Sequence, residues 1–185
     1  MSIPLVAEER SRSYGPLVVS VVALNVLKKA KSMRPTGSKD SVRVEVASVE
    51  LLPGVVAEPN AEVWVEVDVL GLAEASQLTT PRVAITTSTP LLEYAWSSTV
   101  GVPAGSRQQA TLRSALVSTD KEEAVILFNV KSAPISVSGR PAPANAAVAV
   151  ATGFVNLRDV LAQGRDLLDT PVAINSKDGP AGTLK

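Results

Sequence analysis

The side chains that most often carry out catalysis or hold a transition metal are missing from this sequence, which has no histidine and no cysteine. Imidazole is the commonest general base at neutral pH, and imidazole and thiolate groups are the usual zinc ligands. Nucleophilic catalysis would have to use serine with lysine, or paired carboxylates. Gly37, Ser38 and Lys39 resemble the end of a phosphate-binding loop, but no glycine stands at the required spacing before them. We therefore expect neither an enzyme nor a bound cofactor.

Positive and negative side chains are balanced, with 18 Lys plus Arg and 18 Asp plus Glu. A balanced chain has no overall field to attract a polyanion, so nucleic-acid binding is not expected. The apolar run at residues 16–27 is shorter than the roughly 20 residues that a membrane-spanning helix needs. Positive charges follow this run instead of preceding it, which does not fit a secretory signal.

The basic residues after the apolar run form the densest cluster of one charge in the chain. They are Lys28, Lys29, Lys31, Arg34 and Lys39. Three interpretations stay open: a solvated face, a set of charges at the carboxy end of a helix, or a weak contact with anionic lipid. Each charge near a membrane surface would contribute about 1 kcal/mol to such a contact.

The elements that must position any site are mostly β-strands, because apolar and charged residues alternate in many short runs. The expected strands are residues 17–22, 42–46, 62–69, 82–87, 92–96, 124–130, 148–155 and 171–174. Short helices are expected at residues 109–117, where a strand is an alternative, and at 157–163, where Gly164 suits a left-handed C-terminal cap. Residues 132–147 contain three prolines and are expected to form a long exposed loop. Short strands at this spacing predict a sandwich or barrel.

Trp64 is the side chain most suggestive of a binding surface. Alternation places Val63 and Val65 on one face of their strand and leaves Trp64 on the other, beside the acidic residues Glu62, Glu66 and Asp68. Two alternatives follow. Either Tyr94 or Trp96 of a neighbouring strand covers the indole, or the indole is exposed among acids as an anchor for a protein partner.

The organisation along the chain is that of one domain with a separate leading segment. Residues 1–13 are expected to be a flexible terminus and residues 14–31 a strand with a short extension. Residues 32–40 have the Pro, Gly and Ser content of a linker, and residues 41–185 form the domain. The final Gly182-Thr183-Leu184-Lys185 repeats the Gly-x-Leu pattern of Gly15 and Leu17.

Two stretches carry a resemblance to a known family. One begins GFVNLRDVLAQGRDLL at Gly153 and continues into TPVAINSKDGPAGTLK; the other is SVRVEVASVELLPGVVAEPNAEVWVEVDVLGLAEA, from Ser41. Together they make residues 41–185 resemble the carboxy-terminal region of the retinitis pigmentosa GTPase regulator-interacting protein family. The Gly-Arg-Asp-Leu-Leu turn after a short helix is the most specific feature.

The resemblance implies an all-β fold, an antiparallel C2-like β-sandwich of about eight strands with one or two short helices. In that family the chain continues after a Gly-x-Leu-x-Val strand through an Ala-Leu-x-x-Leu segment. Here a similar continuation stands at the front, at residues 15–27. We therefore expect residues 17–22 to close the sandwich, since an unfilled sheet edge exposes unpaired backbone groups. The strand would pair within its own domain, or with a second chain by strand exchange.

A C2-like sandwich raises the question of calcium binding. Calcium-binding C2 domains need several carboxylates from two loops, and calcium takes 6 to 8 oxygen ligands. Here the loop at 51–61 offers only Glu58 and the loop at 132–147 offers no acid, so calcium independence is expected.

The implied role is a protein-interaction module of a ciliary scaffold in the cytoplasm, at the transition zone and basal body. The implied partners are a propeller-type GTPase regulator and nephrocystin-type proteins. The alternatives are a phospholipid-contacting C2 module that uses the basic segment 28–39, and a self-assembling structural repeat.

Overall fold

The computed structural model describes residues 21–22, 40–56, 60–74, 77–85, 91–120, 122–135, 146–168 and 170–185. The strands are β1 (Val21–Val22), β2 (Asp40–Leu51), β3 (Ala61–Val69), β4 (Val83–Ala84), β5 (Leu91–Val102), β6 (Val125–Pro134), β7 (Val148–Asn156), β8 (Val172–Ser176) and β9 (Gly179–Leu184). The helices are α1 (Arg107–Val117), α2 (Leu157–Gln163) and a short 3-10 turn at Glu122–Ala124.

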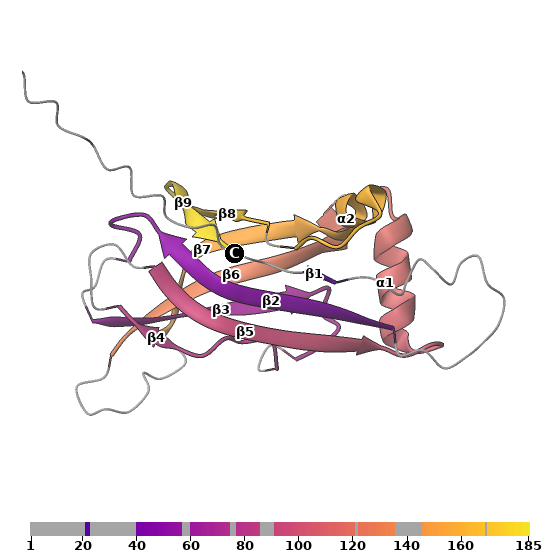
Figure 1. The fold of residues 1–185 in the computed structure, drawn as a ribbon, viewed down its shortest axis with the longest axis horizontal. Helices are drawn as coiled ribbons and strands as arrows, with labels where there is room; N and C mark the ends of the chain where they lie inside the picture. Colours follow the sequence, from indigo (N-terminus) through magenta and orange to yellow (C-terminus); the bar gives the residue numbers. More distant parts are fainter. Residues whose placement is uncertain are drawn as a thin grey trace, which may run out of the picture.

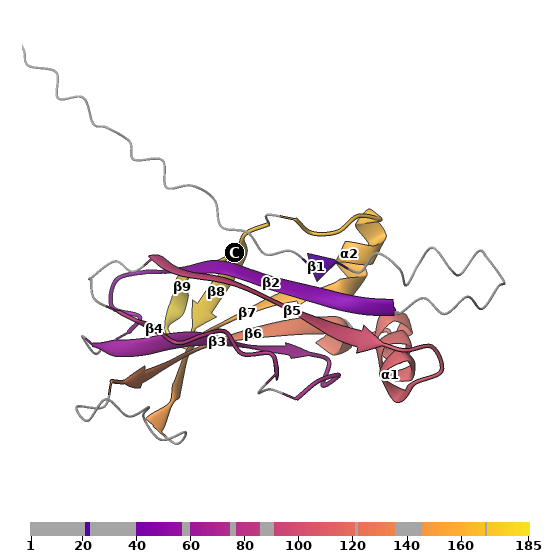
Figure 2. The ribbon, with the colours of Figure 1, turned by 60° about the horizontal axis from the view of Figure 1, so that its bottom comes forward.

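The strands form an antiparallel sandwich. Hydrogen-bonded neighbours follow the order β5, β2, β9, β8, β7, β6, β3, β4, and β1 also pairs with β2. β2 and β5 lie over β3, β6 and β7, while β8 and β9 connect the two layers along one side (Figures 1 and 2). β4 contacts β5, so the path of strands nearly closes. The predicted all-β C2-like sandwich is confirmed.

The core forms between the layers because the strands alternate apolar and polar residues. On β3, Val63 and Val65 are fully buried against the opposite layer. From β6 the core receives Ile126 and Phe128, both fully buried. One face of each strand therefore supplies the core, and the outward residues of β3, β6 and β7 are left to form an external surface.

β2 is longer than the expected strand at 42–46, and the alternation of inward and outward side chains shifts by one residue in its middle. The backbone N–H groups of Ala47 and Ser48 both donate to the carbonyl of Lys185, at N···O distances of 2.8 and 3.2 Å. Two residues opposite one is a β-bulge. It allows Val46 and Val49 both to point into the core, although they are three positions apart.

Both expected helices are present and lie at the same end of the sandwich (Figure 1). The side chain of Ser106 caps α1 by accepting a hydrogen bond from the N–H of Gln109 at 3.2 Å, so the helical alternative for residues 109–117 is the one observed. α2 ends at Gly164 in the left-handed conformation, with φ 65°, as predicted.

Several boundaries differ from the sequence-based expectation. The strand expected at residues 82–87 is only Val83–Ala84 in the described residues. The loop expected from Ser132 begins later, because β6 continues to Pro134. After the last expected strand, at 171–174, the chain forms one further strand, β9.

The strand β9 was missed because its two glycines and its proline are weak strand formers. The observed backbone explains Gly182, which has φ 145°; a Cβ there would lie 2.0 Å from the carbonyl oxygen of Glu50.

The strand expected at residues 17–22 is described at its last two residues only. Val21 pairs with Val44, and Val22 pairs with Arg43. Residues 1–20 and 23–39, which include most of the expected terminus, extension and linker, lie outside the described residues.

Candidate protein-docking face

The outward residues of β3, β6 and β7 form one continuous surface, here called the outer face. Strand register arranges it in three rows across the sheet. The rows are Trp64 with Lys131; Glu66 with Asn129 and Thr152; and Asp68 with Leu127 and Phe154. One end of the outer face therefore has an aromatic ring, Trp64, beside charged side chains, and the other end, at Phe154, is apolar.

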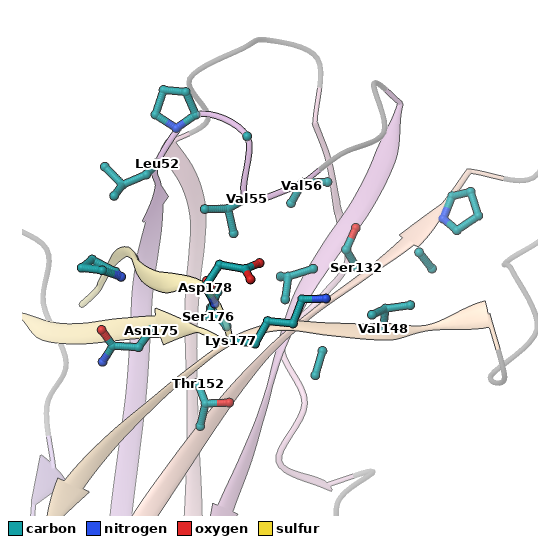
Figure 3. A pocket seen from close by; sticks show the side chains of 18 of the residues that line it. Leu52, Val55, Val56, Ser132, Val148, Thr152, Asn175, Ser176, Lys177 and Asp178 are labelled. Atoms are coloured by element: carbon teal, nitrogen blue, oxygen red, sulfur yellow. The ribbon is translucent and has the colours of Figure 1, made fainter.

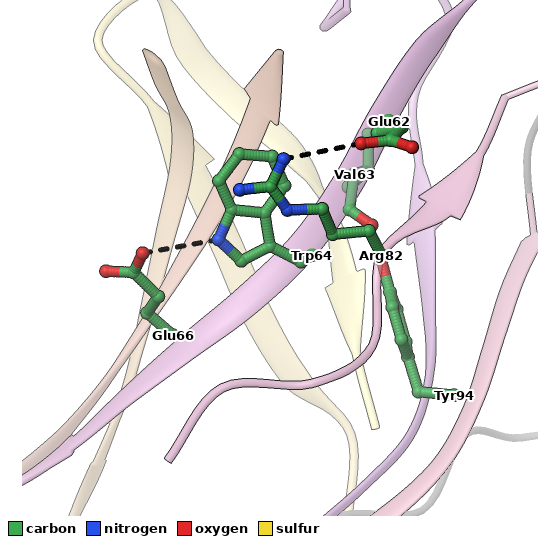
Figure 4. Close-up of polar contacts among 6 residues, drawn as sticks. All are labelled: Glu62, Val63, Trp64, Glu66, Arg82 and Tyr94. Carbon is green, nitrogen blue, oxygen red and sulfur yellow. Dashed lines mark hydrogen bonds and ion pairs between the residues drawn. The ribbon is translucent and has the colours of Figure 1, made fainter. Parts of the chain in front are cut away.

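Trp64 is buried, with 3% of its surface exposed. The Arg82 guanidinium carbon lies 4.2 Å from the ring centroid (Figure 4), and Ala133, Ala146 and Ala147 pack in the same cluster. The indole Nε1–H donates to Glu66 Oε1 at 3.2 Å. Of the two alternatives for Trp64, this geometry fits packing and does not fit an exposed anchor.

The residues that cover Trp64 are not those expected. Tyr94 points into the core, where its hydroxyl donates to the carbonyl of Val63 at 3.0 Å (Figure 4). Burial raises the pKa of Tyr94 well above its usual range. Trp96 packs against the same core. The expected cover by a neighbouring aromatic was wrong because β5 lies in the opposite layer and faces the valine side of β3.

The acidic residues beside Trp64 all have partners within the domain. Arg82 Nη1 pairs with Glu62 Oε2 at 3.4 Å, and Lys131 Nζ pairs with Glu66 Oε2 at 2.6 Å. Asp68 Oδ1 accepts a hydrogen bond from the N–H of Gly71 at 2.7 Å, which closes the turn after β3. The structure therefore brings Glu62, Trp64 and Glu66 together around Arg82 and places Asp68 at the other end of the strand.

The environment of Glu66 shifts its ionisation. Partial burial would by itself raise the pKa of the carboxyl group. The hydrogen bonds from Lys131 and the Trp64 indole, with the positive charges of Lys131 and Arg82, outweigh that effect and lower the pKa below 4.5. The cluster is therefore held together by an ionised carboxylate at neutral pH.

Phe154 and Leu127 are a pair that sequence reasoning missed. They stand opposite each other on β7 and β6 and are 61% and 36% exposed. The available signal was the alternation in β7, where Ala151, Gly153 and Val155 point inwards and leave Phe154 outside. An exposed aromatic beside an exposed leucine is a typical anchor of a protein interface.

A groove of about 920 Å³ is lined by side chains that Figure 3 shows from close by. Its walls come from the turn after β2, the end of β6, the first half of β7 and the β8–β9 turn. Val55, Val56 and Val148 supply apolar surface, and Lys177 and Asp178 stand at the β8–β9 turn.

Among the described residues, no group of three or more acidic side chains is placed to hold a metal ion. Asp120 instead accepts a hydrogen bond from the N–H of Glu122 at 2.9 Å, which is a turn-forming role. In that same part of the chain, no helix has the length and hydropathy to cross a bilayer. The basic residues Lys28, Lys29, Lys31, Arg34 and Lys39 lie outside the described residues.

Fold and surface together define an antiparallel β-sandwich with an exposed apolar pair, Phe154 and Leu127, on its outer face. The family model of the retinitis pigmentosa G-protein regulator interacting C-terminal region matches residues 38–185, well over half of the chain. The chain therefore belongs to that family, as its resemblance predicted. No curated protein matched the sequence significantly.

Proposed function

We propose that this domain is a non-enzymatic, calcium-independent docking module of a ciliary scaffold at the transition zone and basal body. Its partner is the propeller-type GTPase regulator after which the family is named, with nephrocystin-type proteins as further partners. Membership of the family supports this assignment. The mechanism is docking of a preformed surface, with no chemical step.

The observation that carries the proposal is the exposed Phe154–Leu127 pair on a rigid sheet. Strand pairing holds both side chains in place, so little backbone entropy is lost when a partner covers them. Asp68 stands beside Leu127 in the same row. The pair therefore forms an apolar centre with a carboxylate at its border, which suits a partner pocket that is apolar inside and basic at its rim.

The charged end of the outer face, around Trp64, orients the bound partner more than it raises the affinity for it. Glu62 and Glu66 are already paired with Arg82 and Lys131. A partner that approaches this end meets positive and negative charges in fixed positions. Their pattern favours one orientation of the partner over others. Trp64 acts beneath these groups as a support for Arg82.

Binding of the purified propeller domain of the GTPase regulator, measured by calorimetry, tests the proposal. Phe154→Ser should weaken binding about tenfold or more, because a buried aromatic anchor contributes about 2 kcal/mol. Val117→Ser is the matched control, since Val117 is 81% exposed and belongs to α1, not to the strands that form the outer face. Replacing calcium with a chelator should leave the affinity unchanged.

Equal binding by wild type and Phe154→Ser would exclude the outer face as the docking surface. Absence of binding by folded wild-type protein would exclude the proposed partner. Melting temperatures of all three proteins should agree, because both substituted side chains are largely exposed.

A further inference from the structure

The strand β7 extends beyond the strand that borders it on the side away from β6. Within the described residues, β8 pairs with β7 at Thr152 and Gly153, and β8 ends at Ser176, where the turn to β9 begins. In the part of the chain that the structure describes, no strand pairs with residues 148–151 on that side. The backbone groups of this stretch that point away from β6 are therefore left without a partner from any described strand.

The groove shown in Figure 3 runs along this open edge. All five residues from Val148 to Thr152 line it. Side chains of a strand alternate between two faces, so a groove over one face would be lined by every second residue. The one-residue register shift in β7 cannot account for five in a row, because it inserts a single extra residue. The groove therefore meets β7 along its edge, and Val55 and Val56, which pack against the core, form another of its walls.

One charged side chain extends into the groove from the β8–β9 turn. Lys177 lines the groove, is exposed, and reaches over its apolar surface in Figure 3. Within the described residues it takes part in no ion pair. A long lysine stem can carry its ammonium group across apolar surface, whereas the short side chain of Asp178 keeps its carboxylate near the turn. An acidic group on a segment that occupies the groove would therefore complement Lys177.

We propose that the β7 edge from Val148 to Ala151 accepts an extended peptide of a partner protein as an additional strand. The peptide carries apolar side chains on one side and an acidic residue beside Lys177. Backbone hydrogen bonds to the edge supply the affinity, while the apolar wall and the lysine supply the specificity. The site does not depend on the proposed function, because it uses the edge of β7 and not the Phe154 side chain.

The direction of the peptide follows from β8. This strand is antiparallel to β7 and ends where the open edge begins. A peptide that continues in the direction of β8 is also antiparallel to β7, which is the slightly more stable arrangement. Its first residue then stands next to the β8–β9 turn, so the acidic residue belongs at that end. Four residues of strand span about 13 Å, so the site takes a segment of about four or five residues.

The probe is the synthetic peptide acetyl-Glu-Val-Thr-Val-Thr-amide, in which apolar and polar side chains alternate after an acidic first residue. An NMR titration of the 185-residue chain measures its binding. Saturable shifts and slower hydrogen exchange are expected for amides within residues 148–151. The same peptide with lysine in first place should bind about threefold to tenfold more weakly. A version with a central proline, which cannot donate a ladder hydrogen bond, should show no saturable shifts.

Variants of the protein test the charge and the location separately. Lys177→Glu should weaken binding of the acidic peptide about threefold to tenfold, because attraction is replaced by repulsion. Arg113→Glu is the matched control, since it makes the same change of charge at an exposed position of α1 and should bind as the wild type does. Phe154→Ser should also bind this peptide normally, although it is expected to weaken docking on the outer face. All three side chains are exposed, and circular dichroism checks that each variant is folded.

Four results would overturn the proposal. They are no saturable binding by the wild type at millimolar peptide, shifts that leave residues 148–151 unaffected, equal weakening by Lys177→Glu and Arg113→Glu, and loss of binding in Phe154→Ser, which would place the peptide on the outer face. Light scattering without peptide is the last check. A dimer whose amides at 148–151 are already protected would show that a second copy occupies the edge, which also overturns peptide docking.

Discussion

The guanidinium carbon of Arg82 lies 4.2 Å from the centroid of the Trp64 ring. The same guanidinium group pairs with Glu62, and the indole N–H donates to Glu66. A tryptophan among acids is therefore covered by a cation that stands immediately before β4 in the chain. This arrangement buries the indole of Trp64 within the folded domain.

Removal of that cover should destabilise the domain measurably. Arg82→Ala should lower the free energy of unfolding by about 0.5–1 kcal/mol, because a cation–π contact is lost and the ring becomes exposed. Arg43→Ala is the control, since Arg43 also pairs with a glutamate, Glu45, on an exposed strand position. Urea unfolding followed by tryptophan fluorescence measures both. Equal losses for the two variants would contradict a specific role for the ring contact.

The lowered pKa of Glu66 predicts a pH-dependent stability. Because the folded-state pKa lies below the unfolded value, this carboxylate stabilises the fold above pH 4.5, and its contribution is lost as pH falls through the folded-state pKa. Lys131→Met should raise the pKa of Glu66 towards its usual value and should reduce stability more at pH 7 than at pH 3. Carboxyl chemical shifts in an NMR titration report the pKa directly. An unchanged Glu66 titration in Lys131→Met would refute the coupling.

Gly182 should be intolerant of any side chain. An added Cβ would lie 2.0 Å from the Glu50 carbonyl oxygen, and φ is 145°. Gly182→Ala should therefore cost at least about 2 kcal/mol of unfolding free energy. Gly101→Ala is a suitable control, because a Cβ on Gly101 of β5 would have no atom within 4 Å. Chemical denaturation of both variants measures the difference, and a Gly182→Ala protein as stable as Gly101→Ala would contradict the β9 geometry.

Much of the fold could be predicted from local pattern. The alternation from Val63 to Val69 identified β3 and its buried face, and Gly164 marked the end of α2. β9 was missed because local propensity is weak where a strand contains two glycines and a proline. Its conformation is stabilised by pairing with β8, which precedes it directly in the chain, and with β2, which lies far from it in the sequence.

The outer face was predictable only in part. Alternation placed Trp64, Glu62, Glu66 and Asp68 on one side of β3, and this is what the structure shows. The same rule applied to β7 would have found Phe154. Nothing in the local sequence indicates that Phe154 lies two strands from β3, because that distance depends on strand order.

Local pattern along the chain was enough to identify most of the strands, the apolar side of each, the helix cap at Gly164 and the family. Three features became evident only in the folded domain: Arg82 covers Trp64, Phe154 stands opposite Leu127, and β1 follows β9 along β2. The reason is physical: periodicity acts between neighbours in the chain, whereas these contacts depend on strand order and register, which long-range pairing establishes.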